Sequence, residues 1–333
     1  MTNIQTPISK YLSFLLIIIL FSACKKQQPA GTYKNDAIPA DQKAEFHQLN
    51  KQFFDLLKAD KVDEAKNMLS KELLTDNIVN RKLELVGLQA KAGDYSILDE
   101  YYLVDKSDAP GSLVITSGAK NDDAYTLKYN QSTTKENYIA FLVAPKNAAS
   151  QRLITAIYGK YNYGWKLNKL DVDLYALNGK NAPQLYKQAK AAYAKGFWVD
   201  AANDMTMAVR CFHPSGQWQY ANEIPMNEFY YKTLQQASSK VSFPFVIGGV
   251  STQPKVFRIS TEDAPDGTFP LVEYVSKISI SDTTALKKEN ASIKTAIGKI
   301  VPGIDQDKKR VLYTAYSAVP SRNVNPQKYV FGR

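Results

Sequence analysis

The spacing of apolar residues changes near Gly93, and this change limits the possible folds most strongly. From residue 41 to Gly93, apolar side chains recur at steps of three and four, the spacing of one helix face. After Gly93 the period becomes two, in segments rich in Tyr, Val, Ile, Leu and Thr. Helices followed by adjacent strands predict an α+β fold in which the helices pack on an antiparallel sheet.

The expected elements follow from these periods. Three helices precede Gly93, with Asp60 and Asp76 as N-caps of the second and third. Asn162-Tyr163-Gly164 predicts a hairpin turn between the last two strands of the first sheet. The strands expected in this sheet are 95–105, 112–118, 124–129, 137–144, 151–161 and 164–175.

A second region of strands follows a helical segment. A helix is expected over 221–238, with Pro225 near its start, and another over 284–300, capped by Asp282 or Thr283. The alternation over 271–280 predicts a sheet with one solvated face. The strands expected here, in a second and smaller α+β domain, are 241–247, 255–260, 269–281, 310–318 and 328–331.

A short apolar run, Tyr11–Phe21, follows Lys10 near the start of the chain. It is too short to cross a hydrocarbon core, which needs roughly 20 apolar helical residues. The small residues Ser22 and Ala23 come directly before Cys24, as at the cleavage point of a secretory leader. We therefore expect a signal peptide over residues 1–23.

Phe21-Ser22-Ala23-Cys24 resembles the lipobox of bacterial lipoproteins, although Phe21 stands where an aliphatic residue is usual. The resemblance implies lipidation of Cys24, with a diacylglycerol on its thiol and an acyl chain on its amine, so that the bilayer is a partner. Several acyl chains hold a protein stably at a bilayer, because each buried CH₂ contributes about 0.8 kcal/mol to the free energy of membrane binding. In bacterial lipoproteins, an Asp directly after the lipidated cysteine marks retention in the inner membrane, but this chain has Lys25 there. By resemblance, the expected location is the outer membrane, on its periplasmic face. An ordinary signal cut near Ala23 and an uncleaved anchor are the alternatives.

Charge and cysteine content exclude several classes of protein. The net charge is +10, but the lysines are scattered among acids, so a solvated surface is expected and nucleic acid is not an expected partner. With Cys24 lipidated, Cys211 has no intramolecular partner, which excludes a disulfide framework. Its apolar helical context favours a buried, inert thiol.

Two further resemblances concern the fold. Residues 41–177 resemble the cystatin-like cone fold shared by ketosteroid isomerase and nuclear transport factor two, on the segments 54–60, 93–95 and 164–167. Residues 182–214 are similar to one tetratricopeptide hairpin, with small residues at close-packing positions and Pro214 after the second helix. The expected organisation is a signal peptide (1–23), a flexible tether (24–40), a cone-like domain (41–177), a helical hairpin connector (178–238) and a C-terminal α+β domain (239–333).

The sequence shows little catalytic chemistry. His47 and His213 are its only histidines, and Cys211 with His213 supplies at most two of the four ligands of a structural zinc site. No metal, cofactor or catalytic residue is therefore assigned. The cone resemblance implies an acid or tyrosine in a cone mouth. Alternation places one of each adjacent pair of strand residues inward and the other in solvent, and the polar groups are read as a solvated strand face: Asp99, Glu100, Tyr101, Tyr102, Asp171 and Asp173.

The aromatic residues Trp198, Trp218 and Tyr220 cluster around the connector and form the candidate binding patch, since exposed aromatic rings bind ligands at low entropic cost. The leading hypothesis is a non-catalytic, membrane-tethered envelope lipoprotein that binds a protein, peptide or small ligand. The alternatives are a cone-fold enzyme acting on a small hydrophobic substrate, and a structural spacer or assembly factor.

Overall fold

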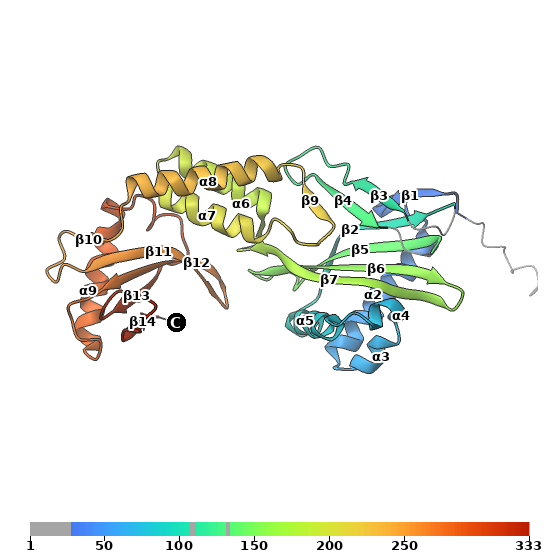
Figure 1. Cartoon of the computed structure of the whole chain (residues 1–333), viewed down its shortest axis with the longest axis horizontal. Coiled ribbons are helices and arrows are strands. Elements are labelled where there is room, and N and C mark those ends of the chain that lie inside the picture. Colours follow the sequence, from blue (N-terminus) through green and yellow to red (C-terminus); the bar gives the residue numbers. More distant parts are fainter. Residues whose placement is uncertain (1–27, 107–110, 131–133, 333) are drawn as a thin grey trace, which may run out of the picture.

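The computed structural model describes residues 28–106, 111–130 and 134–332 (Figure 1). The predicted signal peptide, the lipobox and Cys24 lie outside these residues. The described residues form an α+β molecule with three sheets. Helices α6, α7 and α8 lie between an N-terminal part and a smaller C-terminal sheet with its own helix, as Figure 1 shows. The predicted fold class is confirmed.

The N-terminal helices cover one face of a curled sheet (Figure 1). Their apolar faces form one core with that sheet, in which Phe46, Phe53 and Leu83 are fully buried. Asp76 Oδ1 accepts a hydrogen bond from the Ile78 amide (3.1 Å), directly before the last of these helices. The four helices are α2 (Ala40–Lys58), α3 (Val62–Lys66), α4 (Lys71–Leu74) and α5 (Val79–Ala92).

The curled sheet is antiparallel and has the order β1-β2-β5-β6-β7-β8. The predicted turn at 162–164 joins β6 to β7, and Tyr161 pairs with Gly164. The strands are β1 (Gly31–Lys34), β2 (Ser96–Val104), β5 (Glu136–Ala144), β6 (Gln151–Tyr161), β7 (Gly164–Leu177) and β8 (Lys180–Asn181).

The first strand lies within the segment predicted to be a flexible tether. Thr32 and Tyr33 pair with β2, the Tyr33 ring packs on Tyr102, and Lys34 forms an ion pair with Asp99 (2.9 Å). The tether prediction is therefore wrong for 31–34, because an edge of β2 was free to pair with this β-favouring segment.

A separate sheet covers the second face of the curled sheet. It consists of β3 (Ser112–Thr116), β4 (Tyr125–Asn130) and β9 (Trp218–Tyr220). Both faces of the curled sheet are therefore buried, and neighbouring residues such as Tyr101 and Tyr102 belong to two different cores. Alternation predicted that one residue of each adjacent pair faces solvent. This is wrong for Tyr101 and Tyr102, which are both buried, and Glu100 is buried as well, each at most 2% exposed.

The connector contains the predicted helical hairpin and one further helix: α6 (Ala182–Ala194), α7 (Trp198–Arg210) and α8 (Glu223–Lys240). Asn181 and Gln184 form a capping box at the start of α6. Gly196, with φ at +79°, allows the tight turn from α6 into α7. The helix α7 packs against both α6 and α8.

The C-terminal sheet has the order β10-β11-β12-β13-β14, and the helix α9 (Thr283–Ala296) connects the parallel pair β12 and β13. The predicted strand 269–281 ends early, at Val275. A short 3-10 helix, η2 (Ile297–Lys299), follows α9. The strands are β10 (Phe245–Val246), β11 (Lys255–Ala264), β12 (Gly267–Val275), β13 (Leu312–Tyr316) and β14 (Lys328–Phe331).

The predicted solvated face of this sheet is wrong at Glu273, which is 2% exposed. Its carboxylate accepts hydrogen bonds from the Arg258 guanidinium and from the Tyr316 hydroxyl (3.0 Å). A glutamate on an alternating strand can be buried when a neighbouring strand supplies a matching arginine.

Candidate functional site: a pocket between the connector and the C-terminal domain

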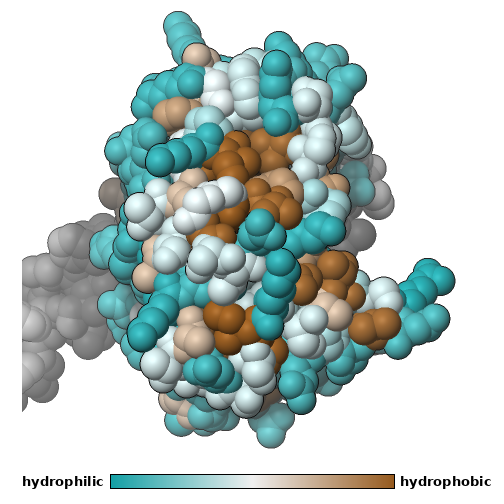
Figure 2. All heavy atoms as spheres, turned by 90° about the vertical axis from the view of Figure 1, so that its left-hand side faces the viewer, coloured by the Kyte–Doolittle hydropathy of each residue, from teal (hydrophilic) through white to brown (hydrophobic). Residues whose placement is uncertain are grey.

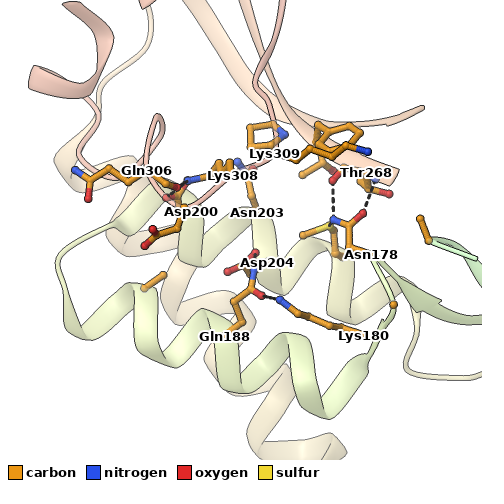
Figure 3. A pocket seen from close by; sticks show the side chains of 18 of the residues that line it. Asn178, Lys180, Gln188, Asp200, Asn203, Asp204, Thr268, Gln306, Lys308 and Lys309 are labelled. Atoms are coloured by element: carbon orange, nitrogen blue, oxygen red, sulfur yellow. Dashed lines mark hydrogen bonds and ion pairs between the residues drawn. The ribbon is translucent and has the colours of Figure 1, made fainter. Parts of the chain in front are cut away.

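A pocket of about 750 Å³ lies between the connector helices and the C-terminal sheet (Figure 3). One wall comes from α6 and α7, with the β7–β8 turn beside it. The opposite wall comes from the start of β12 and from the loop 306–309. Pockets that bind small molecules are commonly of this size and lie at junctions between domains.

Three buried polar side chains of α7 form what we call the floor of this pocket, within the wall that α6 and α7 provide. Asp200, Asn203 and Asp204 share one helix face because they are three and four residues apart. They are only 6–7% exposed. On the opposite face of α7, Met205 is fully buried in a hydrophobic core, which sets the rotation of the helix.

Asp204 points into the pocket, opposite the C-terminal wall (Figure 3). Its Oδ1 accepts a hydrogen bond from Gln188 Nε2 (2.8 Å), and the Gln188 carbonyl oxygen accepts one from the Lys180 ammonium. Burial raises the pKa of Asp204 to about 7, although the Gln188 hydrogen bond opposes this. A carboxyl group that changes charge near neutral pH therefore faces the pocket.

Asp200 has a cationic partner, since Lys308 Nζ lies 2.6 Å from its Oδ2. Burial nevertheless raises the pKa of Asp200. The other oxygen, Asp200 Oδ1, and the amide nitrogen Asn203 Nδ2 have no hydrogen-bond partner among the described residues. Neighbouring protein atoms cover both of these atoms, so neither is presented to a molecule in the pocket.

The loop around Lys308 lies close to α7 because Gly303 has no side chain. Its φ is +90°, and a Cβ there would lie 2.4 Å from the Phe197 ring and 2.7 Å from Asp200 Oδ2. Across the pocket, Asn178 fixes the β7–β8 turn to β12: its Oδ1 accepts from the Thr268 amide and its Nδ2 donates to the Thr268 carbonyl, both at 2.7 Å. Both walls are thus held by specific contacts.

The mouth and sides of the pocket differ from its floor. Lys195 Nζ lies 4.0 Å from the exposed carboxylate of Asp307, so a solvent-screened ion pair spans two walls. The rings of Phe197 and Phe269 provide apolar surface. The pocket thus combines apolar sides with polar groups concentrated on α7, the usual composition of a small-molecule site.

The predicted aromatic patch is not formed. Trp218 and Tyr220 are 4% and 2% exposed, and the Trp218 ring stacks on Tyr125 with centroids 3.5 Å apart. Trp198 is half-buried and packs edge-on against Tyr193. The prediction is wrong because β9 pairs with β4, which places its aromatic residues in the core against the curled sheet.

The curled sheet leaves little space for a substrate at its helix-covered face. Phe46 stacks on Tyr138 at 4.0 Å, and both side chains are fully buried. The buried carboxylate of Glu100 accepts a hydrogen bond from the Tyr138 hydroxyl (2.9 Å) and lies 3.1 Å from His47 Nε2. This network ties α2 to the sheet, and its surroundings are packed with aromatic rings.

The remaining chemical groups lie elsewhere. Cys211 is fully buried, as predicted, and burial raises the pKa of its thiol to about 12. His213 is exposed, 3.8 Å from Glu223. Within the described ranges, no group of three or more His, Cys, Asp and Glu residues could hold a metal ion. Among the same residues, no helix has the length and apolar character needed to span a bilayer.

A second hollow, of about 320 Å³, lies between α7, α8 and β11 and includes Leu234, Phe243 and Ile259. Apolar side chains also gather on the end of the molecule formed by the C-terminal domain, within a hydrophilic surround (Figure 2). The larger pocket is the candidate site, because it alone of the two combines apolar surface with the buried carboxylate of Asp204.

Sequence reasoning missed this pocket. The segment 198–210 does carry a signal, since Asp200, Asn203 and Asp204 form a polar stripe opposite an apolar one. That pattern is usual for a solvent-exposed helix face, and its burial depends on a loop that is about 100 residues later in the chain.

Comparisons of the chain with protein-family models, curated proteins and solved structures found no match.

Proposed function

We propose that this chain is a membrane-tethered, non-catalytic envelope lipoprotein that binds a small polar ligand in the pocket between α7 and β12. The observation that carries the proposal is the pocket itself, which is lined by the buried carboxylate of Asp204 and by the apolar rings of Phe197 and Phe269. Small-molecule sites commonly combine apolar surface with a few polar groups in this way.

The proposed location depends on the sequence. The lipobox-like segment ending at Cys24 supports a lipid anchor in the bacterial envelope, and Lys25 supports the outer membrane with the protein facing the periplasm. An envelope protein is a further possible partner. The cone and tetratricopeptide resemblances remain predictions, and the enzyme alternative loses support because aromatic rings fill the space beside Glu100.

Obstructing the pocket tests the binding function. Ala191 is exposed and lines the pocket, so Ala191→Trp should fill it without disturbing the core. Ala194 is equally exposed on the same helix but lies outside the pocket lining, which makes Ala194→Trp the matched control. Mass spectrometry of small molecules released from protein purified out of envelopes should detect a species reduced at least about tenfold by Ala191→Trp alone.

The proposal requires a difference between these two variants. If the wild type, Ala191→Trp and Ala194→Trp release the same small molecules in the same amounts, the pocket is not a ligand site and the spacer alternative gains support.

A further inference from the structure

The carboxylate of Asp204 is the group of α7 that can meet a ligand. Its side chain lines the pocket and is more than nine-tenths buried. The nearby atoms Asp200 Oδ1 and Asn203 Nδ2 are unpaired among the described residues, but neighbouring protein atoms cover them, so they do not define the ligand.

Asp204 lacks a cationic partner of its own. From α6 it is faced by the neutral amide of Gln188, and from its own helix by Asp200. The ammonium groups of Lys180 on β8 and of Lys308 on the opposite loop act on it through their charge, but Lys180 hydrogen bonds to Gln188 and Lys308 to Asp200. The floor of the pocket therefore offers an ionisable acceptor with room for a positive charge.

We infer that the ligand is a small organic amine. Its ammonium group would donate to the carboxylate of Asp204, which lines the pocket and has only the neutral donor Gln188. This inference rests on the proposed function and identifies the ligand class of that site.

The size and walls of the pocket fit this class. A volume of about 750 Å³ accommodates a sugar-sized molecule, and the rings of Phe197 and Phe269 can pack on its C–H surfaces. An acetylated amine would lose its charge and two of its three N–H donors, so the site should discriminate against it.

Ligand binding and protonation are linked at Asp204. An ammonium group stabilises the ionised carboxylate and lowers its pKa, so binding releases a proton when Asp204 starts out protonated. Because the pKa of Asp204 is about 7 in the free protein, affinity should rise about tenfold from about pH 6 to about pH 8. The aliphatic amine must stay protonated over this range, which favours glucamine as the probe.

Methyl-labelled methionine NMR on the complete mature chain, made soluble by Cys24→Ser, provides the test. Met207 lines the pocket and should shift on titration, whereas Met68 lies in the N-terminal core and serves as the internal control. We expect glucamine to bind at least about tenfold more tightly than sorbitol, which carries a hydroxyl in place of the amine. Asp204→Asn should remove both this preference and the pH dependence, while Asp63→Asn, at an exposed carboxylate outside the pocket lining, should keep them.

Three results would overturn the inference. Equal shifts of Met207 with glucamine and sorbitol would contradict the amine preference while leaving the pocket as a ligand site. An amine preference that survives Asp204→Asn would show that a protein group other than Asp204 binds the ammonium. If neither probe shifts Met207 and Ala191→Trp leaves the released molecules unchanged, both the inference and the proposed function fail. The pH profile of the wild type tests the same point if Asp204→Asn does not fold.

Discussion

At the scale of single residues, Asp204 shows how burial turns an ordinary side chain into a pH-sensitive one. It is 7% exposed and has one neutral hydrogen-bond donor, Gln188. Burial removes water from the carboxylate, which raises its pKa to about 7 from the usual range of an aspartate. The charged form is therefore disfavoured in the folded protein compared with the unfolded chain.

This shift predicts a loss of stability with rising pH. Because the folded-state pKa lies above the unfolded value, the unfolded chain releases the Asp204 proton first, and stability falls from about pH 4 to about pH 7. Wild type should lose about 2 kcal/mol relative to Asp204→Asn between about pH 5 and about pH 8. Urea unfolding at the two pH values measures this difference.

The exposed carboxylate of Asp63 provides a control for that experiment. Asp63→Asn should follow the wild-type pH dependence. Parallel pH profiles for wild type and Asp204→Asn would show that the carboxyl group of Asp204 is solvated in the folded protein.

Asp204 could not have been identified as buried from its neighbours in the chain. A helix with Asp and Asn at steps of three and four fits a solvated face equally well. Its burial follows from the opposite wall, where Lys308 contacts Asp200 and Gly303 allows close approach. By contrast, the burial of Cys211 was predicted from the apolar residues around it.

At the scale of elements, β9 determines the arrangement around the second face of the curled sheet. It has only three residues, Trp218 to Tyr220, yet it pairs with β4 and places two aromatic rings in the core. Sequence patterns detect long strands well, as the match of β6 to its predicted bounds shows. A strand of three residues is too short to show a period, so its partner decides its structure.

This placement predicts a large stability difference between two tryptophans. Trp218→Ala should destabilise the protein by about 3–5 kcal/mol, because it removes a buried ring stacked on Tyr125. Trp198→Ala should cost about 1 kcal/mol, because that ring is half-buried. Urea unfolding of both variants, followed by circular dichroism, measures the difference, and equal losses would contradict the burial of Trp218.

At the scale of the whole molecule, contacts distant in sequence join the connector to the C-terminal domain. Arg210 at the end of α7 makes two hydrogen bonds with Asp263 on β11 (3.0 and 2.6 Å), and Asn178 pairs with Thr268. These contacts hold the two walls of the pocket around the floor formed by α7. The pocket therefore belongs to the assembled molecule and to no single domain.

The proposed anchor predicts where the molecule is found in the cell. Cys24→Ser should move the protein from the membrane fraction to the soluble fraction, because the lipid chains attached at Cys24 would be absent. Fractionation followed by immunoblotting measures this, with Cys211→Ser as the control that should stay with the membrane. Retention of Cys24→Ser with its leader intact would favour the uncleaved anchor.

The sequence by itself determined the local elements and the class of fold. Helical and alternating periods predicted α2, α3 and α5, the hairpin of β6 and β7 and the connector helices, because each depends on neighbouring residues, whereas the four-residue helix α4 was not predicted. Only the tertiary structure decided the pairing of β1 and β9, the burial of Glu100, Glu273 and Trp218, and the assembly of the pocket. These depend on segments far apart in the chain, whose approach leaves no periodic signal in either segment.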